Sequence, residues 1–282
     1  MKKDILLMWA LWNSLWKPYE FNNRPFDLSD FEWHWDDDIA QALCLAETLL
    51  QCNWFKYVTF LDKLQSWYLW WYNSLTDYAE WCGRQTRYVM DKALTDVRYY
   101  PWNENMSWKH LDWNGSLMRV WPAAMRNHNY WFEQSRVTHN SDLCNYSCDF
   151  FTQLLMDVIP GWNKEVAISY AFEYVLNEDM PNELIKLVRD WWYKKKINKP
   201  SWYVVDTLHA VLYTFIHTTS PMEWFEYIIN LWWDTDTTAA IYWYLAWAYY
   251  WIDDECQKLI DQIKDVDYIK YLSRKLIERW SE

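Results

Sequence analysis

The sequence predicts an all-α fold, and three observations support that prediction. Apolar residues recur at spacings of three and four along most of the chain, which is the period of an amphipathic helix. No segment sustains the alternation of apolar and polar residues that is typical of a half-buried strand. Because the chain contains no long biased linker and no repeat of about 20–50 residues, we expect a single domain over residues 1–282.

The first half of the chain contains five segments with helical spacing, separated by prolines, glycines and polar clusters. These segments are residues 5–16, 34–50, 56–75, 80–94 and 112–125. Pro18 ends the first segment, and Gly83 marks a turn within the fourth. In the fifth, Pro122 is expected to interrupt a helix, because proline lacks the backbone N–H that a helix interior requires.

The second half continues the same pattern. Asn140 and Ser141 are alternative N-caps for a helix that Pro160 and Gly161 close. The remaining helical patterns are two within 163–198, one at 201–217, the apolar run 239–252 and the amphipathic tail 256–279. The sequence therefore predicts helices from one end of the chain to the other.

Composition restricts the kinds of partner and compartment. The net charge is −12 and the isoelectric point is near 5.0, which disfavours a nucleic-acid partner because such binding requires a basic surface. The longest uncharged apolar run, Ala239–Ile252, is too short to span a bilayer. None of the 6 cysteines forms a C-x-x-C pair, so buried thiols in a reducing compartment are expected. We therefore expect a cytoplasmic protein without membrane association.

The stretch Trp232–Ile241 combines two aspartates and three threonines just before an apolar run. Asp234 and Asp236 lie two residues apart, and the hydroxyls of Thr237 and Thr238 follow. Such an oxygen-only cluster suits Mg²⁺ or Mn²⁺ better than Zn²⁺, which prefers nitrogen and sulfur ligands. The alternative is a plain acidic helix cap, since aspartate and threonine favour helix N-termini in any case.

A second acidic cluster, Asp36–Asp38, lies far upstream and also precedes a helical pattern. Three adjacent like charges repel one another, so the cluster either binds a cation or forms a strongly solvated helix end. Taken together, the two clusters lead us to expect that both acidic helix starts meet around shared divalent cations.

Tryptophan and glycine occur in unusual proportions. The chain has 26 tryptophans and 3 glycines, whereas an average glycine usage of about 7 % would give roughly 20 glycines. Trp243, Trp247 and Trp251 fall on one stripe of a helix, where three indoles would hold a neighbouring helix away. We interpret many tryptophans as positions where the working protein has glycine, which a codon read differently in two genetic codes would produce. The alternative is a chain that is truly rich in tryptophan.

Four stretches of the chain resemble the ADP-ribosylglycohydrolase family. They are WNSLWKPYEF (12–21), HWDDDIAQALCLAETLL (34–50), WNGSLMRVWPAAM (113–125) with VTH (137–139), and WWDTDTTAAIYWYLAWAYYWI (232–252). Each match improves when the suspect tryptophans are replaced by glycine. The resemblance implies a compact multi-helix bundle with two Mg²⁺ or Mn²⁺ ions in a central cleft. It also implies hydrolysis of the bond between C1 of ADP-ribose and an arginine or serine side chain, or a related acceptor.

The resemblance further implies roles for individual residues. The catalytic residues would be Glu20, Asp37 and Asp38, with Glu20 facing the metals and the scissile bond. The metal ligands would be Asp36, Asp37, Asp38, Asp234, Asp236 and Thr237. The residues lining the substrate pocket would be Trp113, Asn114, Gly115, Ser116, Leu117, Met118, Arg119 and His139. Without the resemblance, His139 is equally well explained as a core histidine. The expected partner is an ADP-ribosylated protein or a small ADP-ribosyl compound.

Some residues depart from the family pattern. Asp36 and Ile39 stand where the family usually has threonine, and of these two only Asp36 can offer an oxygen to a metal. Residues 81–87 lack the aspartate and asparagine of the nitrogenase-regulating members, which argues against arginine-linked ADP-ribose on nitrogenase reductase as the substrate. The alternatives to an enzyme are a catalytically inactive ADP-ribose-binding module and a structural, crystallin-like protein of the same fold.

Overall fold

The computed structural model describes most of the chain. The described residues are 10, 35–52, 54–75, 82–106, 112–126, 130–158, 161–197, 200–220, 223, 227–228, 234–250, 258 and 260–278. Apart from residue 10, the predicted first helix at 5–16 lies outside the described residues, as does the predicted catalytic residue Glu20.

The predicted all-α fold is confirmed. The described α-helices are α2 (Asp37–Gln51), α3 (Tyr57–Trp70), α4 (Arg84–Thr95), α5 (Trp121–Arg126), α6 (Tyr130–Arg136), α7 (Asp142–Asp157), α8 (Lys164–Val175), α9 (Asn182–Val188), α10 (Val204–His217), α12 (Thr235–Tyr249) and α14 (Val266–Glu278). Short 3₁₀ helices are η3 (Pro101–Asn103), η5 (Asn114–Ser116) and η6 (Trp192–Lys194). Within the described ranges, β-type pairing is limited to one isolated antiparallel bridge between Trp113 and Tyr203.

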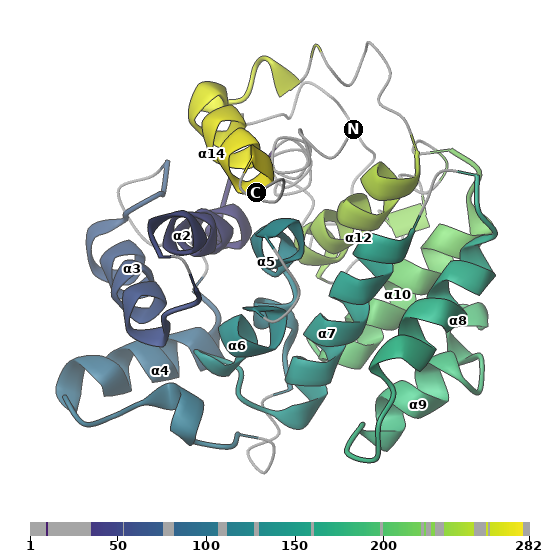
Figure 1. The fold of residues 1–282 in the computed structure, drawn as a ribbon, viewed down its shortest axis with the longest axis horizontal. Helices are drawn as coiled ribbons and strands as arrows, with labels where there is room; N and C mark the ends of the chain where they lie inside the picture. The colour runs from purple at the N-terminus through teal and green to yellow at the C-terminus, as the bar shows by residue number, and fades with distance from the viewer. Residues whose placement is uncertain are drawn as a thin grey trace.

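Elements from both ends of the chain meet beside α5 (Figure 1). Helix α2 packs against α3, α5 and α14, so the last described helix covers the helix that starts with the aspartates. Helix α7 packs against α5, α6 and α8, and α12 packs against α10 and α7. The bundle therefore places α2 and α12, which lie far apart in the sequence, on the two sides of its centre.

The central parts of helices α2 and α12 are buried on all their faces. Every residue of α2 from Asp38 to Ala46 is buried, and so is every residue of α12 from Ala239 to Ala246. A helix that is apolar around its whole circumference fits such a position, which accounts for the runs of alanine, leucine and isoleucine in both segments. Because both helices are central, the acidic residues at their N-termini are held inside the protein.

Two local predictions have different outcomes. Helix α5 starts at Trp121, so Pro122 lies in its first turn and does not interrupt a helix. That expectation was wrong, because the first turn of a helix tolerates a residue without a backbone N–H. For α7, the structure selects Ser141 as the N-cap, since its hydroxyl accepts a 3.1 Å hydrogen bond from the Cys144 N–H.

The described cysteines agree with the expectation of buried thiols. Cys44, Cys52, Cys82, Cys144 and Cys148 are buried free thiols. No helix in the described part of the chain is both long enough and apolar enough to cross a membrane.

Candidate active site

One wall of the candidate active site is the N-terminus of α2. Asp36 caps the helix, and its side chain accepts a 3.0 Å hydrogen bond from the backbone N–H of Asp38. Asp37 and Asp38 occupy the first turn, where the helix dipole favours negative charge. Ligand oxygens of the three aspartates lie within 4.8 Å of one another, so these carboxylates can share one cation.

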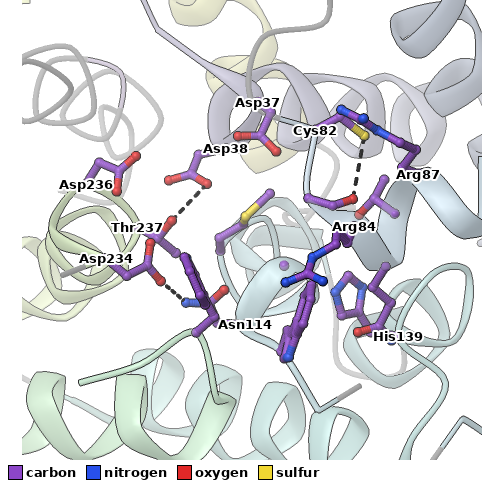
Figure 2. A pocket seen from close by; sticks show the side chains of 17 residues that line it. Asp37, Asp38, Cys82, Arg84, Arg87, Asn114, His139, Asp234, Asp236 and Thr237 are labelled. Carbon is purple, nitrogen blue, oxygen red and sulfur yellow. Dashed lines mark hydrogen bonds between the residues drawn. The ribbon is translucent and has the colours of Figure 1, made fainter. Parts of the chain in front are cut away.

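The second wall is the N-terminus of α12. Asp234 precedes the helix, Asp236 and Thr237 lie in its first turn, and all three residues are buried. Thr237 Oγ1 lies 3.5 Å from Asp38 Oδ1 although 199 residues separate the two. Figure 2 shows the carboxylates of the two helix starts gathered on one side of the pocket. The two acidic helix starts that the sequence analysis expected to meet therefore lie together.

A third segment orients one of these carboxylates. Asn114, the first residue of η5, donates its side-chain amide to Asp234 Oδ2 and to Thr207 Oγ1, the latter at 3.0 Å. The backbone N–H of Asn114 donates to the carbonyl of Trp202 at 2.9 Å. Asn114 is thereby fixed from α10 and from the segment before it, and it holds Asp234 in turn.

These elements enclose a pocket of about 310 Å³. The predicted site residues that line it are Asp37, Asp38, Trp113, Asn114, Gly115, Met118, His139, Asp234, Asp236 and Thr237. The acidic residues come from α2 and α12, and the predicted substrate-binding residues come from η5 and the segment before α7. The pocket therefore combines a strongly acidic region with a glycine turn and a histidine.

Burial raises the pKa values of the carboxyl groups in this pocket. Burial, followed by the charge of Asp234, raises the pKa of Asp236 to about 7. Burial is also the largest cause that raises the pKa of Asp234 to about 6. Burial and then the charge of Asp36 hold the pKa values of Asp37 and Asp38 well above their usual range. Ionised together, these carboxylates repel one another and require a compensating positive charge.

The donor set fits a divalent cation. Asp236 Oδ1 is buried and has no hydrogen-bond partner within the described residues, although buried polar atoms in folded proteins are nearly always paired. Carboxylate and hydroxyl oxygens are the ligands that Mg²⁺ and Mn²⁺ prefer. A cation at this position would provide both the missing partner and the missing charge.

Gly115 and His139 form another side of the pocket. A Cβ atom on Gly115 would lie 2.8 Å from both Cε1 and Nε2 of His139, so glycine is required for the ring to lie against this turn. His139 Nδ1 lies 2.7 Å from Thr138 Oγ1. Burial, and then the charge of Arg119, holds the pKa of His139 well below its usual value. The imidazole is therefore neutral at pH 7.

Several residues that were expected in the pocket lie elsewhere. Ser116, Leu117 and Arg119 are completely buried and do not line the pocket, because the chain turns inward after Gly115 and only Met118 returns to the cavity. Asp36 caps α2 with one carboxylate oxygen and does not line the pocket. Because its ligand oxygen lies within 4.8 Å of those of Asp37 and Asp38, its role as a metal ligand stays a prediction. The expectation that the whole stretch from Trp113 to Arg119 contacts substrate is corrected accordingly.

Comparison with known proteins places the chain in a family. A family model described as ADP-ribosylglycohydrolase matches residues 12–282. The chain belongs to the ADP-ribosylglycohydrolase family. The predicted resemblance and the predicted class, a hydrolase of glycosyl bonds, are confirmed by this match over nearly the whole chain.

Individual relatives agree with this family. The chain is 29% identical over 265 residues to the ADP-ribosylarginine hydrolase Tri1 of Pseudomonas putida (strain GB-1), covering 90% of this chain and 68% of the relative. It is 26% identical over 225 residues to the ADP-ribosyl-[dinitrogen reductase] glycohydrolase of Rhodospirillum rubrum, covering 77% of this chain and 69% of the relative. A solved ADP-ribosylglycohydrolase-related protein complex has the same fold, with a TM-score of 0.77, 22% identity and coverage of 99% and 97% of the two chains.

In this ADP-ribosylglycohydrolase, the start of α4 forms a part of the pocket that was not predicted from the sequence. Arg84 and Arg87 are exposed residues that line the pocket, and the guanidinium carbon of Arg84 lies 5.5 Å from the ring centre of Trp113. Trp202 also lines it, with its ring 6.4 Å from that of Trp113. Residues 81–87 were noted only for the turn at Gly83 and for the aspartate and asparagine that they lack, and arginines in an exposed first turn are too common to indicate a pocket.

The contact between Gly115 and His139 gives a direct test of the glycine turn. Gly115→Ala is expected to destabilise the ADP-ribosylglycohydrolase by about 1–3 kcal/mol, the usual cost of overpacking, because the new methyl group must displace a buried ring. Urea unfolding of four proteins measures this effect: wild type, Gly115→Ala, His139→Ala and the double variant. The cost of Gly115→Ala should disappear in the His139→Ala background, and an equal cost in both backgrounds would show that the ring contact is not its cause.

Proposed function

We propose that this ADP-ribosylglycohydrolase uses two divalent cations, Mg²⁺ or Mn²⁺, to cleave the bond between C1 of an ADP-ribosyl group and its acceptor. The acceptor is an arginine or serine side chain of a protein, or a related small compound. The observation that carries this proposal is the meeting of buried carboxylates from α2 and α12 on one side of the pocket. The names of the two relatives, which specify ADP-ribosylarginine and ADP-ribosyl-dinitrogen reductase, support the substrate class.

The acidic side of the pocket would hold the cations. Asp37 and Asp38 provide carboxylates from one helix start, and Asp234, Asp236 and Thr237 provide oxygens from the other. When bound, the cations supply positive charge that orients the ribose hydroxyls and activates a water molecule. The bond at C1 breaks through an oxocarbenium-like state. That Glu20 positions or deprotonates the attacking water stays a prediction, since this residue lies outside the described part of the chain.

The other side of the pocket would bind the diphosphate and the adenosine. The backbone N–H groups of Gly115 and Ser116 would hold the diphosphate, since Gly115 allows phosphate oxygens to approach the backbone closely. His139, neutral and adjacent to Gly115, offers a further ring donor. The rings of Trp113 and Trp202 provide aromatic surface beside the same turn.

Two measurements, made one after the other, test the proposal. A thermal-shift titration with ADP-ribose and Mg²⁺ comes first, and a higher melting temperature is expected because a ligand that binds only the folded state stabilises it. The protein is then incubated with ADP-ribosyl-arginine and ADP-ribosyl-serine peptides, with EDTA as the control. Release of ADP-ribose that EDTA prevents supports the hydrolase. Stabilisation without release indicates a binding module, and no response in either assay indicates a structural protein; both results contradict the proposal.

A further inference from the structure

Arg119 is a completely buried cation at the junction of the two halves of the site. Its guanidinium donates to Gln41 Oε1 at 2.8 Å, to Gln134 Oε1 at 3.0 Å and to Thr138 Oγ1 at 2.7 Å. The ring of Phe60 covers the guanidinium, with its centre 5.1 Å away. Burying a charge is costly unless its hydrogen bonds are made, and a planar guanidinium makes them in fixed directions. The partners of Arg119 are therefore held in defined orientations.

One of these partners leads to the acidic side of the pocket. Gln41 accepts from Arg119 with its carbonyl oxygen, so its amide nitrogen necessarily points the other way. That nitrogen donates to Asp37 Oδ2 at 3.0 Å. A guanidinium only donates and an ionised carboxylate only accepts, so Arg119 and Asp37 favour the same orientation of the Gln41 amide. Arg119 thus reinforces the role of Gln41 as a donor to Asp37.

The second partner leads to the histidine. Thr138 Oγ1 accepts from Arg119 Nη2 and lies 2.7 Å from His139 Nδ1. A hydroxyl has one hydrogen, and with the guanidinium donating to its oxygen, that hydrogen can be given to Nδ1. A neutral imidazole that accepts at Nδ1 carries its proton at Nε2. Nε2 is the ring nitrogen that lies against Gly115.

The third partner supports the glycine turn itself. Gln134 accepts from Arg119 Nε, and its amide nitrogen donates to the carbonyl of Ser116 at 3.0 Å. Ser116 directly follows Gly115 in η5. One buried side chain therefore reaches the metal-binding helix start, the histidine and the glycine turn through one intermediate residue each.

We propose that Arg119 is a positioning residue that sets the direction of two hydrogen bonds in the site. Through Gln41 it presents an N–H to Asp37, and through Thr138 it keeps His139 as an Nε2–H donor facing the pocket. The roles of the two ends in cation and diphosphate binding rest on the proposed function, whereas the hydrogen-bond directions do not. The network ties the acidic and diphosphate-binding halves of the pocket to a common buried charge.

The test uses variants of the intermediates, because Arg119 itself is so buried that its replacement can prevent folding. Nitrogen-15 NMR of the labelled protein reports which ring nitrogen of His139 carries the proton. Wild type is expected to show the Nε2–H form, Thr138→Val a mixture of the two forms, and Thr138→Ser the wild-type form. Wild type with its proton at Nδ1, or Thr138→Val with an unchanged tautomer, would overturn the proposal.

Binding measurements separate the hydrogen-bond path through Gln41 from the path through Thr138. Thr138→Val is expected to weaken ADP-ribose binding about 5- to 10-fold, the effect of one lost hydrogen bond, with Mn²⁺ affinity unchanged. Gln41→Met is expected to weaken Mn²⁺ binding by a similar factor with the His139 tautomer unchanged. Equal losses of both ligands in both variants would indicate a merely structural effect and contradict the proposal. If wild type binds no ADP-ribose, the proposed function fails, and the NMR result still tests the hydrogen-bond directions.

A separate observation concerns the tryptophans. The non-glycine residues with positive φ in the described ranges are Trp71 (φ 59°), Asn73 (φ 62°), Trp191 (φ 58°) and Asp265 (φ 53°). Asparagine and aspartate adopt this left-handed conformation comparatively often, whereas for a bulky residue it is a genuine outlier. Two tryptophans therefore occupy a backbone conformation that glycine adopts without strain.

The backbone hydrogen bonds and the exposure of Trp71 and Trp191 also favour glycine at these positions. Trp71 directly follows α3, and its N–H donates to the Trp67 carbonyl at 3.0 Å, which is the helix-ending motif that most often uses glycine. Trp191 follows α9, and its N–H donates to the Val188 carbonyl at 3.2 Å. The side chains are 44% and 59% exposed, so packing of the indole rings does not offset the backbone strain.

We infer that the protein made in its native host carries glycine at positions 71 and 191. Mass spectrometry of peptides from the native protein tests this directly, since each should be lighter by the difference between tryptophan and glycine. Native peptides whose masses match tryptophan at both positions would overturn the inference.

A stability measurement on the protein that carries tryptophan at these positions provides a second test. Trp71→Gly is expected to raise the melting temperature, and to raise it more than Trp71→Ala, because alanine retains the Cβ atom that opposes positive φ. Trp70, the last residue of α3 and 75% exposed, is the matched control. Trp70→Gly should lower the melting temperature, since glycine weakens a helix. Equal effects of glycine at the two positions would contradict the inference.

Discussion

Asp236→Ala is expected to abolish divalent-cation binding and to reduce turnover of an ADP-ribosylated peptide by about 1000-fold or more, the scale of losing a central electrostatic contact. Asp236 carries the buried oxygen without a partner and lies on the wall shared by α2 and α12. If Asp236 is a metal ligand as proposed, its removal leaves the remaining carboxylates insufficient to hold the cations. Isothermal titration with Mn²⁺ and an ADP-ribose release assay measure the two effects separately.

This variant is not expected to lose activity by unfolding. Burial and the neighbouring carboxylate raise the pKa of Asp236, so removing its charge relieves repulsion in the metal-free protein and should leave its melting temperature equal or higher. Asp267→Ala is the matched control, because this aspartate lies in the exposed first turn of α14. Full activity of Asp236→Ala, or an equal loss in both variants, would refute the assignment of the site.

Metal-free protein is expected to lose stability as the pH rises from about 4 to about 7. The pKa values of Asp234 and Asp236 are raised from 3.8 to about 6 and about 7 in the folded protein, chiefly by burial. Between pH 4 and 7 the folded state therefore binds more protons than the unfolded state, and the free energy of unfolding falls with pH. Since one pKa unit corresponds to about 1.4 kcal/mol, the loss for Asp236 alone is on the order of 4 kcal/mol.

Urea unfolding at intervals of pH, with and without Mn²⁺, measures this dependence. Mn²⁺ should restore stability most strongly above pH 7, where the carboxylates are ionised and bind the cation. Asp236→Asn should flatten the pH dependence of the metal-free protein, because it removes the group with the pKa of about 7. Stability that is independent of Mn²⁺ at pH 8, or an unchanged slope in Asp236→Asn, would contradict the proposed cation site.

Much of the acidic side of the site could be predicted from local sequence. Asp36 and Asp234 precede buried apolar runs, and both prove to be residues at the N-termini of central helices. Capping preferences and helical period act over one or two turns, so they are visible in a short stretch. The N-cap of α7 was narrowed to Asn140 or Ser141 for the same reason, and the structure selects Ser141.

The other side of the pocket could not be predicted so fully. Arg119 was expected to face substrate, but the chain turns inward after Gly115 and its guanidinium bonds to three buried side chains. Arg84 and Arg87 were not predicted as pocket residues, since only the packing of α4 beside the pocket distinguishes them from ordinary surface arginines. Which way a side chain points across a turn depends on neighbours that are remote in sequence.

The sequence by itself determined that the chain is helical and that two helices start with aspartates, because hydrophobic period and capping are properties of neighbouring residues. Only the tertiary structure decided that these starts face each other, that Asp236 is left with an unpaired buried oxygen, and that Arg119 links the two halves of the pocket. Those properties depend on burial and on contacts across as many as 199 residues. The pKa shifts follow from burial in the same way, since the cost of charge depends on how much water the whole fold excludes.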